Sequence, residues 1–332
     1  MMLGTGLFFI FGLIVLANAI TAAGNPIWSR LFIWLLLLAN VPVFLFGLGI
    51  FLLPPETLSG LPAFADLLLL DWQAAGLSFM GMGAWGMAVS LPPVRRLLAR
   101  VLPSLNADSA IQALGLVFSG YLVGNTVFSL TQGGLEELAE TAVAASIYDI
   151  LLMQALFAGT AVLGVGLYTR RSSEETRRRL GLERPTRHQL LIGVVWIFGL
   201  VAIQAVTGAI WTLLDSSQAE LLEGISSELF GNIDTLGEWL LLAAATGFGE
   251  ELLFRGAIQP VFGIGGTAFL FATAHIQYGI TPITLVVFII GIILGIIRRR
   301  YNTTTAIFVH SGYNLVLGLL SLFALQLENM VG

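Results

Sequence analysis

The sequence of 332 residues contains no cysteine and no lysine, and it has only three histidines. The absence of cysteine excludes disulfides, thiolate metal sites and a catalytic thiol. Charged residues are scarce as well: they make up 11% of the chain against 57% hydrophobic residues, and the mean hydropathy is +0.90. So few charges cannot cover a water-exposed surface, because an average globular chain has about 25% charged residues. The net charge of −5 excludes a basic nucleic-acid-binding surface, so we expect no nucleic-acid partner.

Long apolar runs are what the sequence has instead. A bilayer core of about 30 Å needs about 20 apolar residues per helix, and the runs predict an all-α, polytopic transmembrane helix bundle of about ten spans. The approximate spans are 3–23, 31–54, 72–91, 109–131, 144–168, 189–213, 236–256, 266–278, 281–297 and 303–325. The eighth is too short to cross the bilayer, and Gly263, Gly265 and Gly266 come before it or begin it. It is therefore expected to be a broken or half-inserted helix, or to be continued by the segment before it.

The positions of the arginines predict the orientation. All fifteen basic residues are Arg, and every one except Arg255 falls in alternate loops between the expected spans. The opposite loops are acidic, at 136–140 and 215–234. The positive-inside rule places the Arg-rich loops in the cytoplasm and both termini outside. The longest basic loop, residues 170–189, is expected to touch anionic lipid headgroups, so membrane lipids are predicted partners. A docking surface for a soluble protein is the alternative for this loop.

One charge cluster is not explained by topology. Glu250, Glu251 and Arg255 lie in the inner part of the seventh span, where a charged side chain costs roughly 2.5–3.5 kcal/mol. Glu251 and Arg255 are four residues apart and share a helix face, which predicts an ion pair. Glu250 points about 100° away from Glu251, so it can take a different role. The alternative is an interfacial charge group that reaches water from the helix end.

Two histidines and an asparagine fall in later apolar segments. His275 is placed on the short eighth helix, and His310 two turns into the tenth span, with Asn314 one turn further along the same face. If the eighth helix starts again near Gly266, the side chains of Glu250, His275 and His310 reach similar depths and can line one cytoplasm-facing cavity. If that helix starts at Gly256, His275 lies near the opposite side of the membrane and cannot line the same cavity.

This set of side chains suits hydrolysis of a peptide bond. A carboxylate and an imidazole can polarise one water, while a second imidazole and an amide face the developing oxyanion. His and Glu with water also suit a divalent metal such as Zn²⁺, with Glu250, His275 and His310 as the candidate ligands. No HExxH motif supports a zinc site directly. The residues leave both possibilities open, with a metal and without one.

Three ordered motifs carry a family resemblance: EELLFR (Glu250–Arg255), FATAH (Phe271–His275) and HSGYN (His310–Asn314). They resemble the motifs EExxxR, FxxxH and HxxxN of the CPBP family of intramembrane proteases, which is named for CAAX prenyl proteases and bacteriocin-processing enzymes and is also called Abi. The resemblance covers roughly residues 190–325. It predicts a protease core at 189–332, preceded by additional membrane helices of unknown role at 1–188.

The resemblance also implies roles for the motif residues. Glu250 would activate a water with His275 as its partner on that water, and His310 and Asn314 would lie on the oxyanion side. Glu251, Arg255 and Phe271 would support the site. The substrate would be a hydrophobic or lipidated protein or peptide. The cofactor is left unassigned: family members are described both with and without a metal. The Arg-only basic set suits a GC-rich bacterial genome, and the protein is expected in a bacterial plasma membrane.

Two other classes of function remain as alternatives. Buried carboxylates and histidines in a helix bundle also form ion or proton relays, so the chain could be a coupled membrane transporter. It could also be a non-catalytic membrane scaffold that keeps the motifs for stability.

Overall fold

The computed structural model describes residues 2–53 and 71–331, and these residues form helices joined by short connections. Within this part of the chain the only β-type pairing is one bridge between Leu167 and Arg171. Seven helices among the described residues are long and apolar enough to cross a membrane, or eight if a pair bent by 91° counts as one span. Each of the ten predicted spans overlaps a helix, although the eighth does so only in part. The prediction of an all-α polytopic membrane bundle is therefore confirmed; the end of the second span, residue 54, lies outside the described residues.

The chain divides into two compact units, of which the first comprises 1–138 and 273–280. Its helices are α1 (Met2–Ala23), α2 (Pro26–Leu52), α3 (Trp72–Ser90), α4 (Pro92–Leu98), α5 (Ala110–Thr131) and the short 3₁₀ turn η4 (Ile276–Tyr278), and α6 (Gly134–Thr141) runs across its boundary. Glycines bring α2 and α3 together: a Cβ at Gly47 or Gly83 would lie 2.5 Å from the backbone nitrogen of Met80 or Phe44. Such small residues allow the close backbone approach typical of membrane helices.

Polar side chains inside the first unit are satisfied locally. Asn40 on α2 donates to the carbonyl of Leu36 and accepts a hydrogen bond of 2.7 Å from the hydroxyl of Tyr121 on α5. Arg95 is only 2% exposed, although the sequence places it in a loop. Its guanidinium donates to three carbonyls, among them those of Val89 and Ser90 at the end of α3. It therefore caps the carboxyl end of α3 instead of reaching solvent.

The second unit comprises 139–272 and 281–332. Its helices are α7 (Ile147–Val165), α8 (Ser173–Leu180), α9 (Arg187–Leu214), α10 (Ser216–Phe230), α11 (Leu236–Glu251), the π-helix η3 (Leu252–Ile258), α12 (Gln259–Thr273), α13 (Pro282–Arg300) and α14 (Thr303–Val331). Two helices, α7 and α8, precede the predicted boundary at residue 188 and pack in this unit. The predicted boundary at residue 188 separates a protease core from additional helices by function, not by packing. It therefore stays a prediction.

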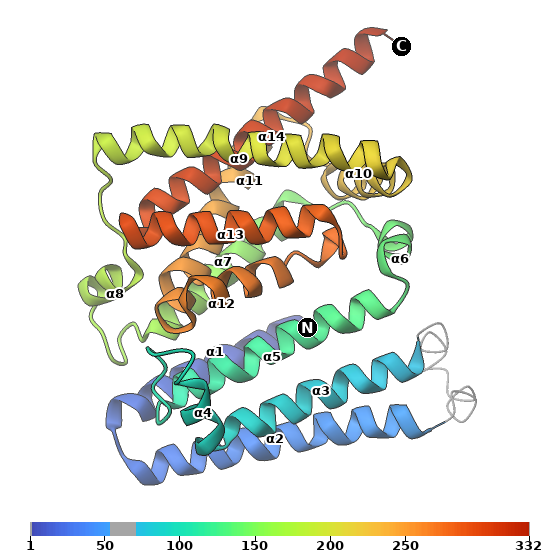
Figure 1. Cartoon of the computed structure of the whole chain (residues 1–332). Coiled ribbons are helices and arrows are strands. Elements are labelled where there is room, and N and C mark those ends of the chain that lie inside the picture. Colours follow the sequence, from blue (N-terminus) through green and yellow to red (C-terminus); the bar gives the residue numbers. More distant parts are fainter. Residues whose placement is uncertain (1, 54–70, 332) are drawn as a thin grey trace. The chain divides into compact units, whose positions relative to one another are not determined.

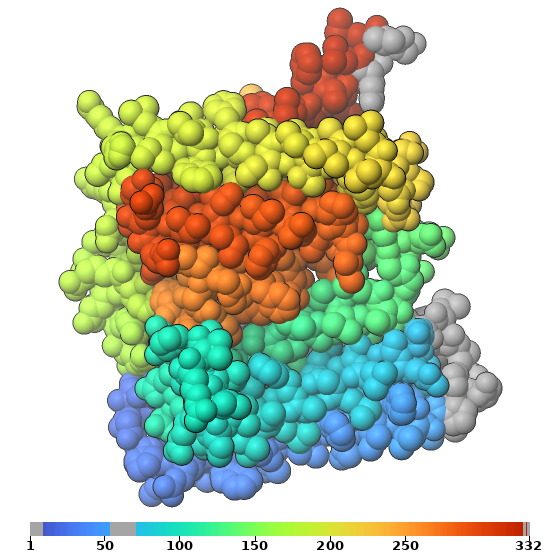
Figure 2. All heavy atoms as spheres, in the orientation of Figure 1, coloured from blue at the N-terminus to red at the C-terminus, as the bar shows by residue number. Residues whose placement is uncertain are grey.

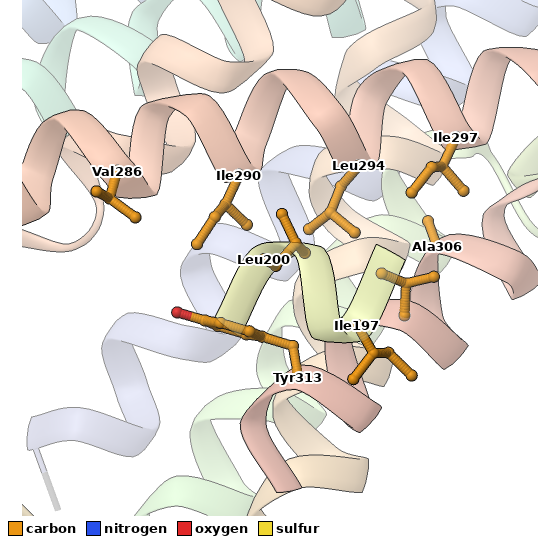
Figure 3. Close-up of a cluster of buried hydrophobic side chains, with 9 residues drawn as sticks. Ile197, Leu200, Val286, Ile290, Leu294, Ile297, Ala306 and Tyr313 are labelled. Carbon is orange, nitrogen blue, oxygen red and sulfur yellow. The ribbon is translucent and has the colours of Figure 1, made fainter. Parts of the chain in front are cut away.

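The core of the second unit is an apolar cluster between α9, α13 and α14. Figure 1 shows α9 and α13 side by side, and on the face drawn in Figure 2 their side chains meet directly. Leu294 of α13 and Leu200 of α9 are fully buried and point toward each other in Figure 3, with Tyr313 of α14 beside them. The hydroxyl of Tyr313 donates to the side-chain oxygen of Gln204, so a hydrogen bond also joins α14 to α9.

The helix that follows the glutamate pair is broken, as the glycines at 263–266 predict. Gly263 has φ 71° and ψ 178°, a conformation open essentially only to glycine, and it divides α12 into two parts. A new helical segment therefore starts after Gly263 and ends at Thr273. The prediction that the eighth helix reaches residue 278 and carries His275 is wrong, because the α-helix stops two residues before that histidine.

Candidate active site

The paired glutamates lie at the end of α11, where two glycines let neighbouring helices approach. A Cβ at Gly247 would lie 2.8 Å from the backbone nitrogen of Ser311 on α14. A Cβ at Gly249 would lie 2.7 Å from the carbonyl oxygen of Gln154 on α7. Since both contacts come directly before Glu250, the sequence Gly-Phe-Gly-Glu-Glu places the carboxylates between α7 and α14.

Glu251 and Arg255 form the predicted ion pair. The distance between Arg255 Nη1 and Glu251 Oε1 is 2.9 Å, and both side chains are almost fully buried. Arg255 lies in the π-helix η3, seven residues long; π-helices are rare and are found frequently at functional sites. A charge pair removed from water in this way is costly unless both ions are compensated, so its presence points to a role beyond anchoring at an interface.

His310 lies between the two carboxylates. Its Nδ1 is 2.9 Å from Glu251 Oε1, and its Nε2 is 4.0 Å from Glu250 Oε2. The imidazole is buried, with 5% of its side chain exposed. An Nδ1–H donated to Glu251 sets the tautomer, and the other nitrogen then faces Glu250. The residues form a linear chain from Arg255 through Glu251 and His310 to Glu250.

Phe271 packs against two members of this chain. Its ring centroid lies 4.2 Å from Arg255 Cζ and 5.9 Å from the His310 ring, with the two rings nearly perpendicular. The guanidinium over the ring face gains a cation–π attraction, which is larger in a dry environment. The structure therefore brings the first residue of the second motif into contact with the first and third motifs.

Gln154 of α7 is a site residue that the motifs do not reveal. It is 3% exposed, and its Nε2 lies 3.4 Å from Glu250 Oε1. The sequence does carry a signal for it, because a glutamine in the middle of an apolar helix needs a polar partner in the membrane. Gln154 lies outside the segment that resembles the protease family, so the candidate site also uses a helix from the preceding part of the chain.

Asn314 and His275 are placed differently from the other motif residues. Asn314 Nδ2 donates a hydrogen bond of 2.9 Å to the hydroxyl of Thr246, one turn before Glu250 on α11. This bond uses one of the two amide hydrogens of Asn314. His275 follows α12 and belongs to the first compact unit, where its ring stacks on that of Tyr278 at 6.1 Å. Its predicted partnership with Glu250 stays a prediction.

The donors suited to a metal in the second unit are the Glu250 carboxylate and His310 Nε2. Catalytic zinc sites take three protein ligands, and in the described part of the chain no group of three or more His, Asp or Glu side chains is placed to hold an ion. The second unit by itself therefore does not fit a zinc site.

Comparison with known proteins gives one match, over residues 232–316, to the family model described as type II CAAX prenyl endopeptidase Rce1-like. This segment contains all three motifs and the four side chains that connect Arg255 through Glu251 and His310 to Glu250. Residues 232–316 are therefore similar to the CAAX prenyl endopeptidase family. The resemblance predicted from the motifs is confirmed, and the match does not extend to residues 1–231. No curated protein and no solved structure matches the chain.

Proposed function

We propose that the protein is an intramembrane endopeptidase that hydrolyses a peptide bond of a hydrophobic or lipidated substrate. A multi-pass membrane protein with a CAAX-protease-like segment is the starting point. The observation that carries the proposal is the buried chain Arg255–Glu251–His310–Glu250, in which the imidazole is held by one carboxylate and faces the other.

Glu250 is the general base in this proposal. The 4.0 Å between Glu250 Oε2 and His310 Nε2 is too long for a direct hydrogen bond, and two groups at such a separation can share a bridging water. We propose that the attacking water binds to both groups, loses its proton to Glu250 and adds to the substrate carbonyl. The peptide C–N bond of this adduct then breaks as Glu250 returns the proton to the leaving amine nitrogen, which leaves a carboxylate and a free amine as products.

Glu251 and Arg255 orient His310 and do not touch the reacting atoms. The Nδ1–H of His310 donates to Glu251, as the second-shell carboxylates of catalytic histidines do. Arg255 balances the charge of Glu251, so the negative charge that remains near the water is that of Glu250. In this proposal His310 lies beside the water, whereas the motif resemblance places His310 on the oxyanion side with Asn314. Asn314 keeps its predicted role on the oxyanion side, and His275 its predicted role on the water.

The proposed substrate class comes from the family resemblance, and the proposed side of the membrane on which the site opens comes from the positions of the arginines. The family name points to a prenylated CAAX protein or a similar lipidated peptide. The Arg-rich loops suit a site open to the cytoplasm of a bacterial plasma membrane, with both termini outside.

The experiment compares the membrane peptides of cells that carry the wild-type protein with those of cells that carry Glu250→Gln. This variant keeps the size of the side chain and removes the base. The proposal expects at least one peptide whose new terminus appears only with the wild-type protein, at equal protein levels. Identical peptides in both cell lines would contradict it. Ion- or pH-driven flux in proteoliposomes that is lost in Glu250→Gln, with no cleaved peptide, would favour a transporter.

A further inference from the structure

Four half-buried arginines gather at one end of the second unit: Arg170 and Arg171 after α7, Arg179 in α8, and Arg298 in the last turn of α13. The arginines next to them in the sequence are exposed instead of half-buried. Arg177 and Arg178 in α8 and the two arginines that follow Arg298 are exposed. The basic loop is therefore divided into side chains that face water and side chains that turn inward.

The inward arginines are held by backbone carbonyls. Arg179 Nη1 donates a hydrogen bond of 2.8 Å to the carbonyl of Gly256, and its Nη2 lies 3.4 Å from that of Ala257. Arg171 donates to the carbonyl of Val165 at the end of α7. These bonds fix the position of two guanidiniums without neutralising their charge, since a carbonyl carries only a partial negative charge.

Like charges accumulate at this place. Burial, followed by the positive charges of Arg171, Arg298 and Arg170, lowers the pKa of Arg179 to about 10. Burial and the charge of Arg171 also lower the pKa of Arg170. The carboxylate of Glu175 acts on Arg171 from one side, but its oxygen is bonded to the backbone and hydroxyl of Ser172. A bound anion would offset the repulsion among the four guanidiniums.

We propose that Arg170, Arg171, Arg179 and Arg298 bind the phosphate of an anionic lipid headgroup. Guanidinium groups match phosphate oxygens with paired hydrogen bonds. The height in the membrane favours a lipid as the source, because Arg170 and Arg171 follow the apolar helix α7 and Arg298 lies in the last turn of the apolar helix α13. Basic pockets at such span ends bind anionic headgroups.

The site is linked to the candidate active site through η3. The carbonyls of Gly256 and Ala257 that accept from Arg179 lie in the same π-helix as Arg255, which pairs with Glu251. A lipid that holds Arg179 in place also braces this helix. The binding itself does not depend on the proposed peptidase activity, so a failure of one leaves the other standing.

The test measures the binding of short-chain phosphatidylglycerol, and of phosphatidylcholine as the neutral comparison, to the purified full-length protein in detergent. The readout is the shift of the unfolding temperature with lipid concentration. We expect phosphatidylglycerol to stabilise the wild-type protein and phosphatidylcholine not to. Arg298→Gln should weaken the phosphatidylglycerol effect about tenfold, because a charge-assisted bond is lost.

Arg299→Gln is the matched control, since it makes the same change at the next, exposed residue. Arg170→Gln with Arg178→Gln as its control provides a second pair if Arg298→Gln does not fold. Equal binding by the inward and the exposed variants would overturn the proposal. A shift with inorganic phosphate as large as that with phosphatidylglycerol would overturn the lipid as the source of the phosphate.

Discussion

The two glutamates of the candidate site make different contacts with His310. His310 joins two carboxylates, yet only Glu251 is close enough for a direct hydrogen bond, at 2.9 Å. The same oxygen of Glu251 also meets Arg255. Glu251 is thus the centre of the ion pair and of the imidazole orientation, whereas Glu250 faces the imidazole from a longer distance. In the proposed mechanism Glu251 therefore holds the site together and Glu250 reacts.

Glu251→Ala should destabilise the protein strongly. It leaves the buried Arg255 without its carboxylate, and breaking a buried pair typically costs about 3–5 kcal/mol. The measurement is the unfolding temperature in detergent. Glu174→Ala is the comparison, because its pair with Arg177 is exposed and should leave that temperature unchanged. Equal effects of the two substitutions would contradict the assigned role of Glu251.

Gln154→Leu should lower kcat about tenfold or more with little change in KM, because Glu250 loses a hydrogen-bond donor that positions it. Leucine has a similar volume, so the packing of α7 is kept and the unfolding temperature should change little. Met153→Leu, at an exposed position of the same helix, is the control. A wild-type kcat in Gln154→Leu would show that Gln154 does not position Glu250 for catalysis.

Helices come together at the site because of the glycines of α11. A substitution Gly247→Ala places a Cβ 2.1 Å from Ser311 Oγ and 2.8 Å from the Ser311 backbone nitrogen, so α14 must shift. We expect a loss of stability of about 1–3 kcal/mol, together with a loss of activity, since α14 carries His310. Thermal unfolding and peptide cleavage measure the two effects.

Gly237→Ala is the control on the same helix, because the nearest atom to its Cβ, at 4.0 Å, is the hydroxyl oxygen of Thr235. Alanine is a better helix former than glycine by roughly 1 kcal/mol, so this variant should be as stable as the wild type or slightly more stable. If Gly247→Ala behaved like Gly237→Ala, the close contact between α11 and α14 would not be needed.

Apolar run length and motif order were enough to predict most elements. The ten spans, the break near Gly263 and the pair of Glu251 with Arg255 all follow from spacing along one helix or from hydropathy. The contact of His310 with Glu251 does not, because it depends on how α14 is rotated against α11. The same holds for Gln154, whose partner is 96 residues away, and for the buried Arg95, which a sequence reads as one more loop arginine.

The whole chain is a multi-pass membrane protein that is divided into two compact units. Because the sequence has no cysteine, single cysteines report the side of the membrane without interference. Ser173→Cys in the basic loop should be labelled by an impermeant reagent only from the cytoplasmic side. Ser217→Cys in the acidic loop should be labelled only from the outside. Labelling of both positions from one side would contradict the predicted orientation.

The proposed role of Glu250 in activating the water is measured by the cleavage rate of a prenylated peptide by the purified protein. Glu250→Gln should lower kcat by a factor of at least about 100, as the loss of a general base does, while the unfolding temperature stays the same. Glu238→Gln makes the same chemical change in the first turn of α11, about three turns away from Glu250, and should retain wild-type activity. Cleavage by Glu250→Gln at the wild-type rate would contradict the account.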